Sequence, residues 1–290
     1  MARRRGPAVG CGMSEKPLPF GVLLRRWRQD RRMTQEDLAL AASSSTRHLS
    51  YLETGRAQPS RDMVLRLAEH LQVPLRDQNA LLLAAGYAPM FEERSLAELE
   101  AAKLAIEQVL QAHKPYPAFA LDRRWNVVLS NSALPQLYEG CAPEFLRKPI
   151  NAIRLVLHPL AMGPRIVNFV EWRAHVMTVL RQQVATRPDP VIQALLAEVM
   201  GYPAPAGGIA PAITEGPQRY ATPLQIATRF GTVSLLNTTT VFGTPTEITL
   251  SELALEMLFP ADAATAAIVK TMAEEEATLA ANQAVLQKAS

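Results

Sequence analysis

The strongest constraint on the fold of this chain is the segment from Thr34 to Ser60, which reads TQEDLALAASSSTRHLSYLETGRAQPS. The threonine at its start is a favourable N-cap and predicts that a first helix begins there, whereas the serines from Ser43 onward break that helix. A second helix starts at Ser45 or Thr46 and ends at Gly55, where a left-handed backbone costs least. The apolar residues fall on one face of each predicted helix, and they are Leu38, Ala39 and Ala42 in the first and Leu49 and Leu52 in the second.

At these positions the chain carries a recognisable pattern, made of Thr34-Gln35, Leu38-Ala39, Leu49, Glu53-Thr54-Gly55-Arg56 and Pro59-Ser60. With these residues it resembles the Xre/Cro-type helix-turn-helix repressors over roughly residues 18–87. The resemblance implies an all-α, five-helix, lambda-repressor-like domain that binds double-stranded DNA. Ser43 departs from the family pattern, which usually has Gly at the turn, and at positive φ a serine is strained by up to about 1 kcal/mol.

The resemblance also implies which side chains contact DNA. Those in the groove are Ser45, Thr46, Arg47 and Tyr51. From their own positions, Gln35 at a helix start and Arg56 just past a helix end are expected to contact phosphates. Arg47 is the natural reader of a guanine, because a bidentate contact contributes about 1–3 kcal/mol of discrimination; contact with phosphate alone is the alternative. Glu53 is expected to have a structural role instead, in an ion pair with an arginine of the preceding helix or in hydrogen bonds to backbone N–H groups.

Three further helices complete the predicted N-terminal domain: Phe20–Arg32, a helix capped by Ser60, and Leu75–Ala85, which Gly86 ends. The arginines expected on the outer face of the first helix are Arg25, Arg26, Arg28, Arg31 and Arg32. Residues 1–91 contain 14 Lys and Arg against 8 Asp and Glu, whereas the remainder contains 16 against 19. A basic N-terminal part therefore suits contact with a polyanion, and the mildly acidic remainder does not.

With 290 residues and 48% hydrophobic content, the chain is long enough for two cores. Its cysteines, Cys11 and Cys141, form neither a metal-binding spacing nor a disulfide framework, which favours the cytoplasm. No run approaches 18 apolar residues, so we expect no membrane span. We expect residues 1–17 to be a disordered tail, in which Met13 offers a second plausible start.

After Pro115 the pattern changes and predicts an α+β domain over residues 113–260. A helix at Leu96–Gln111, within residues 88–112, is either a linker or the first helix of this second domain. A hairpin of two strands opens the domain, a loop rich in Pro and Gly spans Gly201–Pro217, and residues 261–290 contain a last helix, Asp262 to about Gln287. The remaining predicted helices are Ser132–Tyr138, Ile150–Leu157, Pro164–Ala185 and Pro190–Met200, and the later strands are Thr222–Phe230, Thr232–Phe242 and Glu247–Leu258.

Several short motifs follow the helix-turn-helix, namely Gly86-Tyr87-Ala88-Pro89, Pro115-Tyr116-Pro117-Ala118, Trp125 with Asn131, Asn151 with Arg154, His158-Pro159, Arg165 and Glu171-Trp172-Arg173. With them the chain resembles the ligand-binding domain of the MmyB-like regulators over roughly residues 88–260. The resemblance implies a PAS-like fold, in which a five-stranded antiparallel sheet and helices enclose an apolar pocket. It also implies a small apolar or fatty-acid-like ligand.

The predicted ligand site combines apolar walls with a polar anchor. The walls are expected from Trp125, Phe169 and Trp172, and the candidate anchors for a carboxylate are Arg154, His158, Arg165 and His175. Asn131 is a further candidate, although the cap of the following helix is the favoured role for it. Ordinary core or surface roles are the alternative for each of these residues.

Enzymatic chemistry finds little support in the sequence. The five histidines have no metal-binding spacing, and no G-x-S-x-G, P-loop or dinucleotide fingerprint appears, so we expect no cofactor and no metal. The sequence therefore predicts a cytoplasmic transcription regulator, most simply a homodimer, with operator DNA and a small ligand as partners. In one alternative the second domain serves only dimerisation, and in another it binds a protein partner.

Overall fold

The computed structural model describes residues 18–187, 189–205 and 222–288, with side chains described up to Leu279. The predicted disordered tail and most of the Gly201–Pro217 loop lie outside the described residues. The chain divides into two compact units, Met1–Glu92 and Glu93–Ser290. Among the described residues, none of the helices combines the length and apolar character needed to cross a bilayer.

The first unit consists of α1 (Phe20–Asp30), α2 (Gln35–Ala41), α3 (Thr46–Glu53), α4 (Arg61–His70) and α5 (Leu75–Ala84). The predicted caps are present, because Thr34, Ser45 and Ser60 each accept a hydrogen bond from a backbone N–H of the first turn. The predicted five-helix all-α domain is therefore confirmed.

The apolar stripes of all five helices meet in one core. Leu24, Leu38 and Leu49 are fully buried, as the sequence pattern predicts. Gly21 brings α1 into backbone contact with the end of α3, since a Cβ at this position would lie 2.5 Å from the carbonyl oxygens of Leu52 and Glu53. Close packing of α1 on α3 thus depends on the absence of a side chain at residue 21.

The second unit contains a six-stranded antiparallel sheet with strand order β3-β2-β1-β6-β5-β4. The strands are β1 (Ala118–Leu121), β2 (Asn126–Ser130), β3 (Ile150–Asn151), β4 (Leu224–Thr228), β5 (Gly231–Val241) and β6 (Ala254–Pro260). The longer helices are α6 (Glu100–Ala112), α7 (Ala152–Leu157), α8 (Phe169–Thr186), α9 (Pro190–Met200) and α11 (Ala263–Lys288). This arrangement confirms the predicted α+β class.

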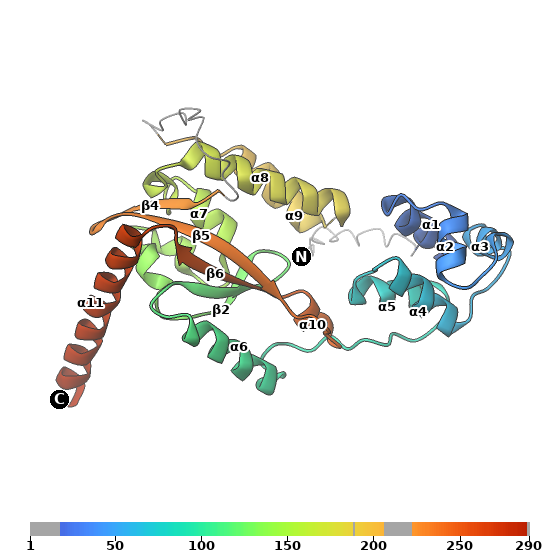
Figure 1. The fold of residues 1–290 in the computed structure, drawn as a ribbon, viewed down its shortest axis with the longest axis horizontal. Helices are drawn as coiled ribbons and strands as arrows, with labels where there is room; N and C mark the ends of the chain where they lie inside the picture. The colour runs from blue at the N-terminus through green and yellow to red at the C-terminus, as the bar shows by residue number, and fades with distance from the viewer. Residues whose placement is uncertain (1–17, 188, 206–221, 289–290) are drawn as a thin grey trace, which may run out of the picture. The chain divides into compact units, whose positions relative to one another are not determined.

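Helices cover the two faces of the sheet differently (Figure 1). On one face, Ile106 and Leu110 of α6 pack against Ala118, Ala120 and Leu255, so α6 is part of the second unit. On the other face lies a larger core, to which α7, α8 and α9 contribute. The first turns of α11 pack along β5.

Three details of the predicted second domain were wrong. The sheet has a sixth strand, the two-residue β3, where a helix was expected to begin at Ile150. The run Glu247–Leu258 is not one strand, because a single helical turn, α10 (Ile248–Ser251), precedes β6; the Ser251 hydroxyl closes this turn by donating to the Ile248 carbonyl. Residues 135–138 form a short 3-10 helix instead of the predicted longer helix.

The start of α8 was also mispredicted. The helix begins at Phe169 and not at Pro164, because the preceding residues pair with the edge strand β4. The backbone N–H of Val167 donates to the Gln225 carbonyl at 2.8 Å, and Ile166 forms an isolated bridge with Ile226. Pairing with β4 satisfies backbone groups that an α-helix would have satisfied internally.

Candidate functional site

The turn between α2 and α3 adopts the conformation that the sequence predicts. Ser43 has φ 50°, in the left-handed region that the family usually fills with glycine. The Ser45 hydroxyl accepts from the backbone N–H of His48 at 3.1 Å and so fixes the first turn of α3. Gly55 follows the helix with φ 72°.

The beginning of α3 presents an exposed polar surface. Ser45, Thr46 and Arg47 are all exposed, and Tyr51 lies one turn further along, half-buried. The Arg47 Nε donates to the Tyr51 hydroxyl at 3.1 Å, and its guanidinium lies 5.5 Å from the centre of the Tyr51 ring. Contact with Tyr51 holds the arginine over this surface, where base edges would be read if α3 entered a major groove. Arg56, beyond the helix end, is exposed as well.

A buried ion pair holds α1 against α3. Arg28 Nε donates to Glu53 Oε1 at 2.6 Å and Arg28 Nη2 donates to Oε2 at 3.1 Å, which confirms the predicted structural role of Glu53. The Gln35 side-chain amide donates to the same carboxylate at 2.8 Å, so part of its donor capacity is used within the protein. The expectation that Arg28 lies on the outer face was wrong, because its bidentate contact with Glu53 requires it to point inward.

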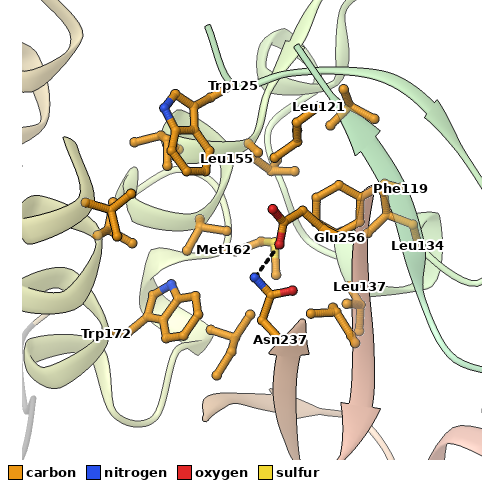
Figure 2. A pocket seen from close by; sticks show the side chains of 18 of the residues that line it. Phe119, Leu121, Trp125, Leu134, Leu137, Leu155, Met162, Trp172, Asn237 and Glu256 are labelled. Atoms are coloured by element: carbon orange, nitrogen blue, oxygen red, sulfur yellow. Dashed lines mark hydrogen bonds between the residues drawn. The ribbon is translucent and has the colours of Figure 1, made fainter. Parts of the chain in front are cut away.

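In the second unit, a cavity of about 450 Å³ lies between the sheet and helices α7 and α8. Its walls are mostly apolar and aromatic, as Figure 2 shows for Phe119, Trp125, Leu155, Met162 and Trp172. The Trp125 Nε1 donates to the Gln183 side chain at 2.8 Å, which fixes that indole in the wall. A volume of this size is typical of small-molecule sites, which range over roughly 300–1,000 Å³.

The polar part of the cavity lies on the inner face of β5 and β6. Glu256 is only 5% exposed, and Asn237 and Thr239 on β5 donate to its carboxylate. Figure 2 shows the Glu256 side chain directed into the cavity beside Asn237. Burial raises the pKa of the Glu256 carboxyl above its ordinary value, and the hydrogen bonds from Asn237 and Thr239 oppose that shift.

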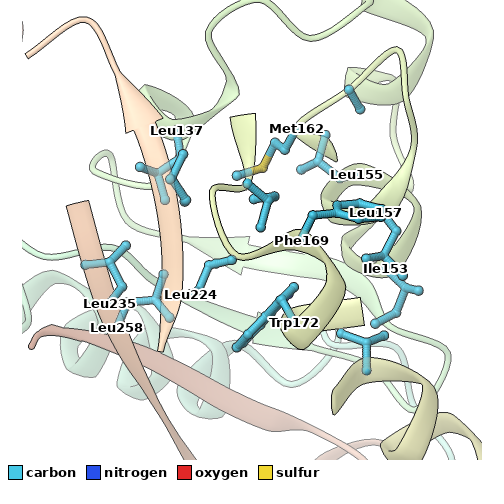
Figure 3. Close-up of a cluster of buried hydrophobic side chains, with 14 of the residues drawn as sticks. Leu137, Ile153, Leu155, Leu157, Met162, Phe169, Trp172, Leu224, Leu235 and Leu258 are labelled. Carbon is cyan, nitrogen blue, oxygen red and sulfur yellow. The ribbon is translucent and has the colours of Figure 1, made fainter. Parts of the chain in front are cut away.

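Of the predicted ligand residues, the structure brings Trp125 and Trp172 to the cavity wall, and with them His175. Phe169 does not line the cavity, because it packs into the adjoining core beside Leu157 (Figure 3). Asn131 is fully buried away from the cavity, where its amide donates to the carbonyls of Leu110 and Tyr116.

The other three predicted anchors, Arg154, His158 and Arg165, are placed elsewhere. Arg154 pairs with Glu198 of α9 at 2.7 Å, and the His158 ring packs against Phe145 with centroids 4.2 Å apart. Arg165 donates to the Leu137 carbonyl. Each of these side chains ties loops or helices together, and none of them lines the cavity. Within the described residues, the lining of the cavity contains neither Lys nor Arg.

Sequence reasoning missed the polar groups of the cavity. A signal was present, since Glu256 is the one charged residue in the apolar run Ala254–Pro260, and Asn237 interrupts the β-branched and apolar run of β5. Burial of a lone acidic residue in such a run marks it as a candidate functional group.

Among the described residues, no group of three or more His, Cys, Asp or Glu side chains is placed to hold a metal ion.

Comparison with known proteins relates both units to defined families. A family model described as a helix-turn-helix domain matches residues 19–82, and a model described as the MmyB-like transcription regulator ligand binding domain matches residues 103–272. No curated protein matches the chain significantly.

Among solved structures, the clp gene regulator ClgR from Corynebacterium glutamicum is 28% identical, with 33% of this chain and 90% of that chain covered and a TM-score of 0.21. The second family model spans more than half of the chain and follows the match to the helix-turn-helix domain. The chain therefore belongs to the MmyB-like transcription regulators, DNA-binding proteins with a C-terminal ligand-binding domain.

Proposed function

We propose that this regulator binds operator DNA through α3 and that occupancy of the cavity in its second unit by a small, largely apolar molecule changes DNA affinity. The observation that carries the proposal is the 450 Å³ cavity, since a domain used only for dimerisation or for a protein partner would fill this space with side chains. A homodimer on an inverted repeat is the simplest assembly for a domain of this type.

The DNA-binding part rests on the exposed beginning of α3. Thr46 and Arg47 would reach base edges, and Tyr51, which holds Arg47, would contact a thymine methyl. Phosphate contacts would come from Gln35, at the start of α2, and from Arg56. Arg25 and Arg26 are exposed on α1 and add positive charge to the same unit.

The regulatory part follows from linkage. A ligand changes DNA affinity only if it binds the DNA-competent and DNA-incompetent arrangements of the protein unequally. The candidate couplers are α6, which packs on the sheet, and α11, whose first turns pack along β5. Both helices contact the sheet that forms one wall of the cavity, and a change of cavity shape would reach them directly.

The test combines selection of an operator with identification of the ligand. Sites selected from random DNA would give the operator, and native mass spectrometry of the purified protein, followed by extraction, would give any bound molecule. We expect the extracted molecule to change operator affinity at least fivefold, within the 1–3 kcal/mol usual for allosteric coupling.

A matched pair of variants makes this test specific. Val179→Trp fills the cavity from α8, whereas Val191→Trp makes the same change at an exposed position on α9. We expect the first variant to lose the bound molecule and the ligand response, and the second to keep both. An empty wild-type protein whose DNA affinity no small molecule alters would instead support a purely structural second domain.

A further inference from the structure

Glu256 is a charged group that an apolar cavity does not need for its stability. Leucine or glutamine at this position on β6 would avoid the cost of removing a carboxylate from water, which is substantial unless the group is paired. The two groups that donate to it, Asn237 and Thr239, are neutral. The carboxyl is therefore hydrogen-bonded in the described structure without being neutralised by a cation at the cavity.

The cross-strand register places an aromatic ring beside this carboxyl. Glu256 is directly opposite Phe119 on β1 and directly opposite Thr239 on β5, so the three residues form one row across the sheet. Tyr138, Trp125 and Trp172 also line the cavity. Aromatic faces attract organic cations, with a contribution of about 0.5–2 kcal/mol that grows when water is excluded.

The Trp172 side chain supplies an independent indication of a ligand. The residue is 8% exposed, and its Nε1–H is a buried donor with no hydrogen-bond partner among the described residues. Buried polar groups are nearly always satisfied in folded proteins, so an orphaned donor in a cavity wall indicates that a molecule or an ordered water occupies the space, and it carries no information on the charge of a ligand head group. His175 is the only imidazole in the cavity lining that the structure describes; it is exposed and packs on Trp172 with centroids 5.3 Å apart.

We propose that the cavity selects an apolar organic cation, such as a lipophilic amine or quaternary ammonium compound, whose positive charge lies against Glu256 and the aromatic wall. The inference rests on the proposed ligand-binding function and specifies its ligand class. An anionic head group, as in a fatty acid, would meet a like charge at Glu256. Furthermore, the cations expected to hold it, Arg154 and Arg165, are tied to Glu198 and to the Leu137 carbonyl instead.

Three probes with one tail and different head groups test this directly: dodecylamine, dodecanol and dodecanoate. Their affinities for the full-length protein would be measured by isothermal titration calorimetry at micromolar concentrations. We expect the amine to bind at least tenfold more tightly than the other two, a difference of about 1.4 kcal/mol.

Two matched variants assign the preference to the buried carboxyl. Glu256→Gln keeps the size of the side chain and one acceptor oxygen while it removes the charge, and we expect it to lose the tenfold preference while it still binds dodecanol. Glu144→Gln removes the same charge from an exposed position outside the cavity and should keep the preference. Circular dichroism would establish that both variants are folded.

The outcomes separate this inference from the function on which it rests. Tightest binding of dodecanoate, equal binding of the three probes, or an amine preference that survives in Glu256→Gln would overturn the choice of a cation and leave a ligand-binding domain in place. Failure of all three probes to bind folded wild-type protein would contradict the proposed ligand-binding function itself.

Discussion

Replacing Arg28 by methionine should destabilise the DNA-binding unit severely, although Arg28 is only one of several arginines in α1. Unlike Arg25 and Arg26, it is buried and paired with Glu53. The Glu53 side chain is 2% exposed, and after the change it would retain only the Gln35 amide as a donor. Breaking a buried pair by removing one partner costs about 3–5 kcal/mol, because the remaining charge is buried without compensation. At roughly 0.05–0.15 kcal/mol per residue, a unit of this size has only about 4–11 kcal/mol of stability.

Urea denaturation measures this loss. Fluorescence of Trp27, which lies half-buried in α1, would report on the first unit alone in a background where Trp125 and Trp172 are phenylalanine. Arg25→Met is the matched control, since Arg25 is exposed on the same helix, and surface changes of this kind stay within about 0.5 kcal/mol.

A double variant makes the reasoning refutable. When Glu53→Leu is added to Arg28→Met, both charges are gone, and we expect most of the lost stability to return because no unpaired charge remains. A loss below about 1 kcal/mol for Arg28→Met, or a double variant as unstable as the sum of the two single ones, would refute the account of a buried ion pair.

Three further predictions follow from other contacts. Gly21→Ala should cost about 1–3 kcal/mol in the same assay, because the new methyl group overlaps backbone oxygens of α3 and must push α1 away; an unchanged midpoint would contradict this packing. Arg47→Ala should relax the preference at one base pair of the selected operator by about 1–3 kcal/mol, whereas uniform weakening on all sequences would assign Arg47 to a phosphate. In ligand-free protein, Glu256→Gln should be the more stable form at neutral pH. Because folding raises the pKa of Glu256, the wild-type protein has its full free energy of unfolding below the ordinary pKa of 4.5 and loses part of it as the pH rises through the folded-state pKa. A difference in melting temperature between wild type and Glu256→Gln that stays constant from pH 4 to pH 8 would argue against this.

The sequence determined the first unit almost completely. Local rules were sufficient there, because caps such as Thr34 and Ser60, the turn at Ser43 and the apolar spacing act within a few residues of one another. The exception was Arg28, whose pattern matches an outer face. Its burial depends on Glu53, 25 residues away in the chain, and no helical periodicity reports such a contact.

In the second unit, the sequence predicted the class and most elements, but the tertiary structure decided the details and the site. The start of α8 depends on pairing with β4, more than 50 residues later, and this pairing overrides the local preference for helix. Their side-chain chemistry indicated Arg154, His158 and Arg165 as candidate anchors for a carboxylate, yet their partners come from other elements and hold them away from the cavity.

Only the sheet register brings Phe119, Glu256 and Thr239 into one row, because antiparallel pairing joins residues from three distant segments. Along the chain, Glu256 stands out only as the one charged residue of the apolar run Ala254–Pro260. Its burial in a cavity with several aromatic residues in the wall is what changes its chemistry, since the cost of a charge and the strength of its interactions depend on exclusion of water. That exclusion is a property of the packed fold, and no local stretch of sequence contains it.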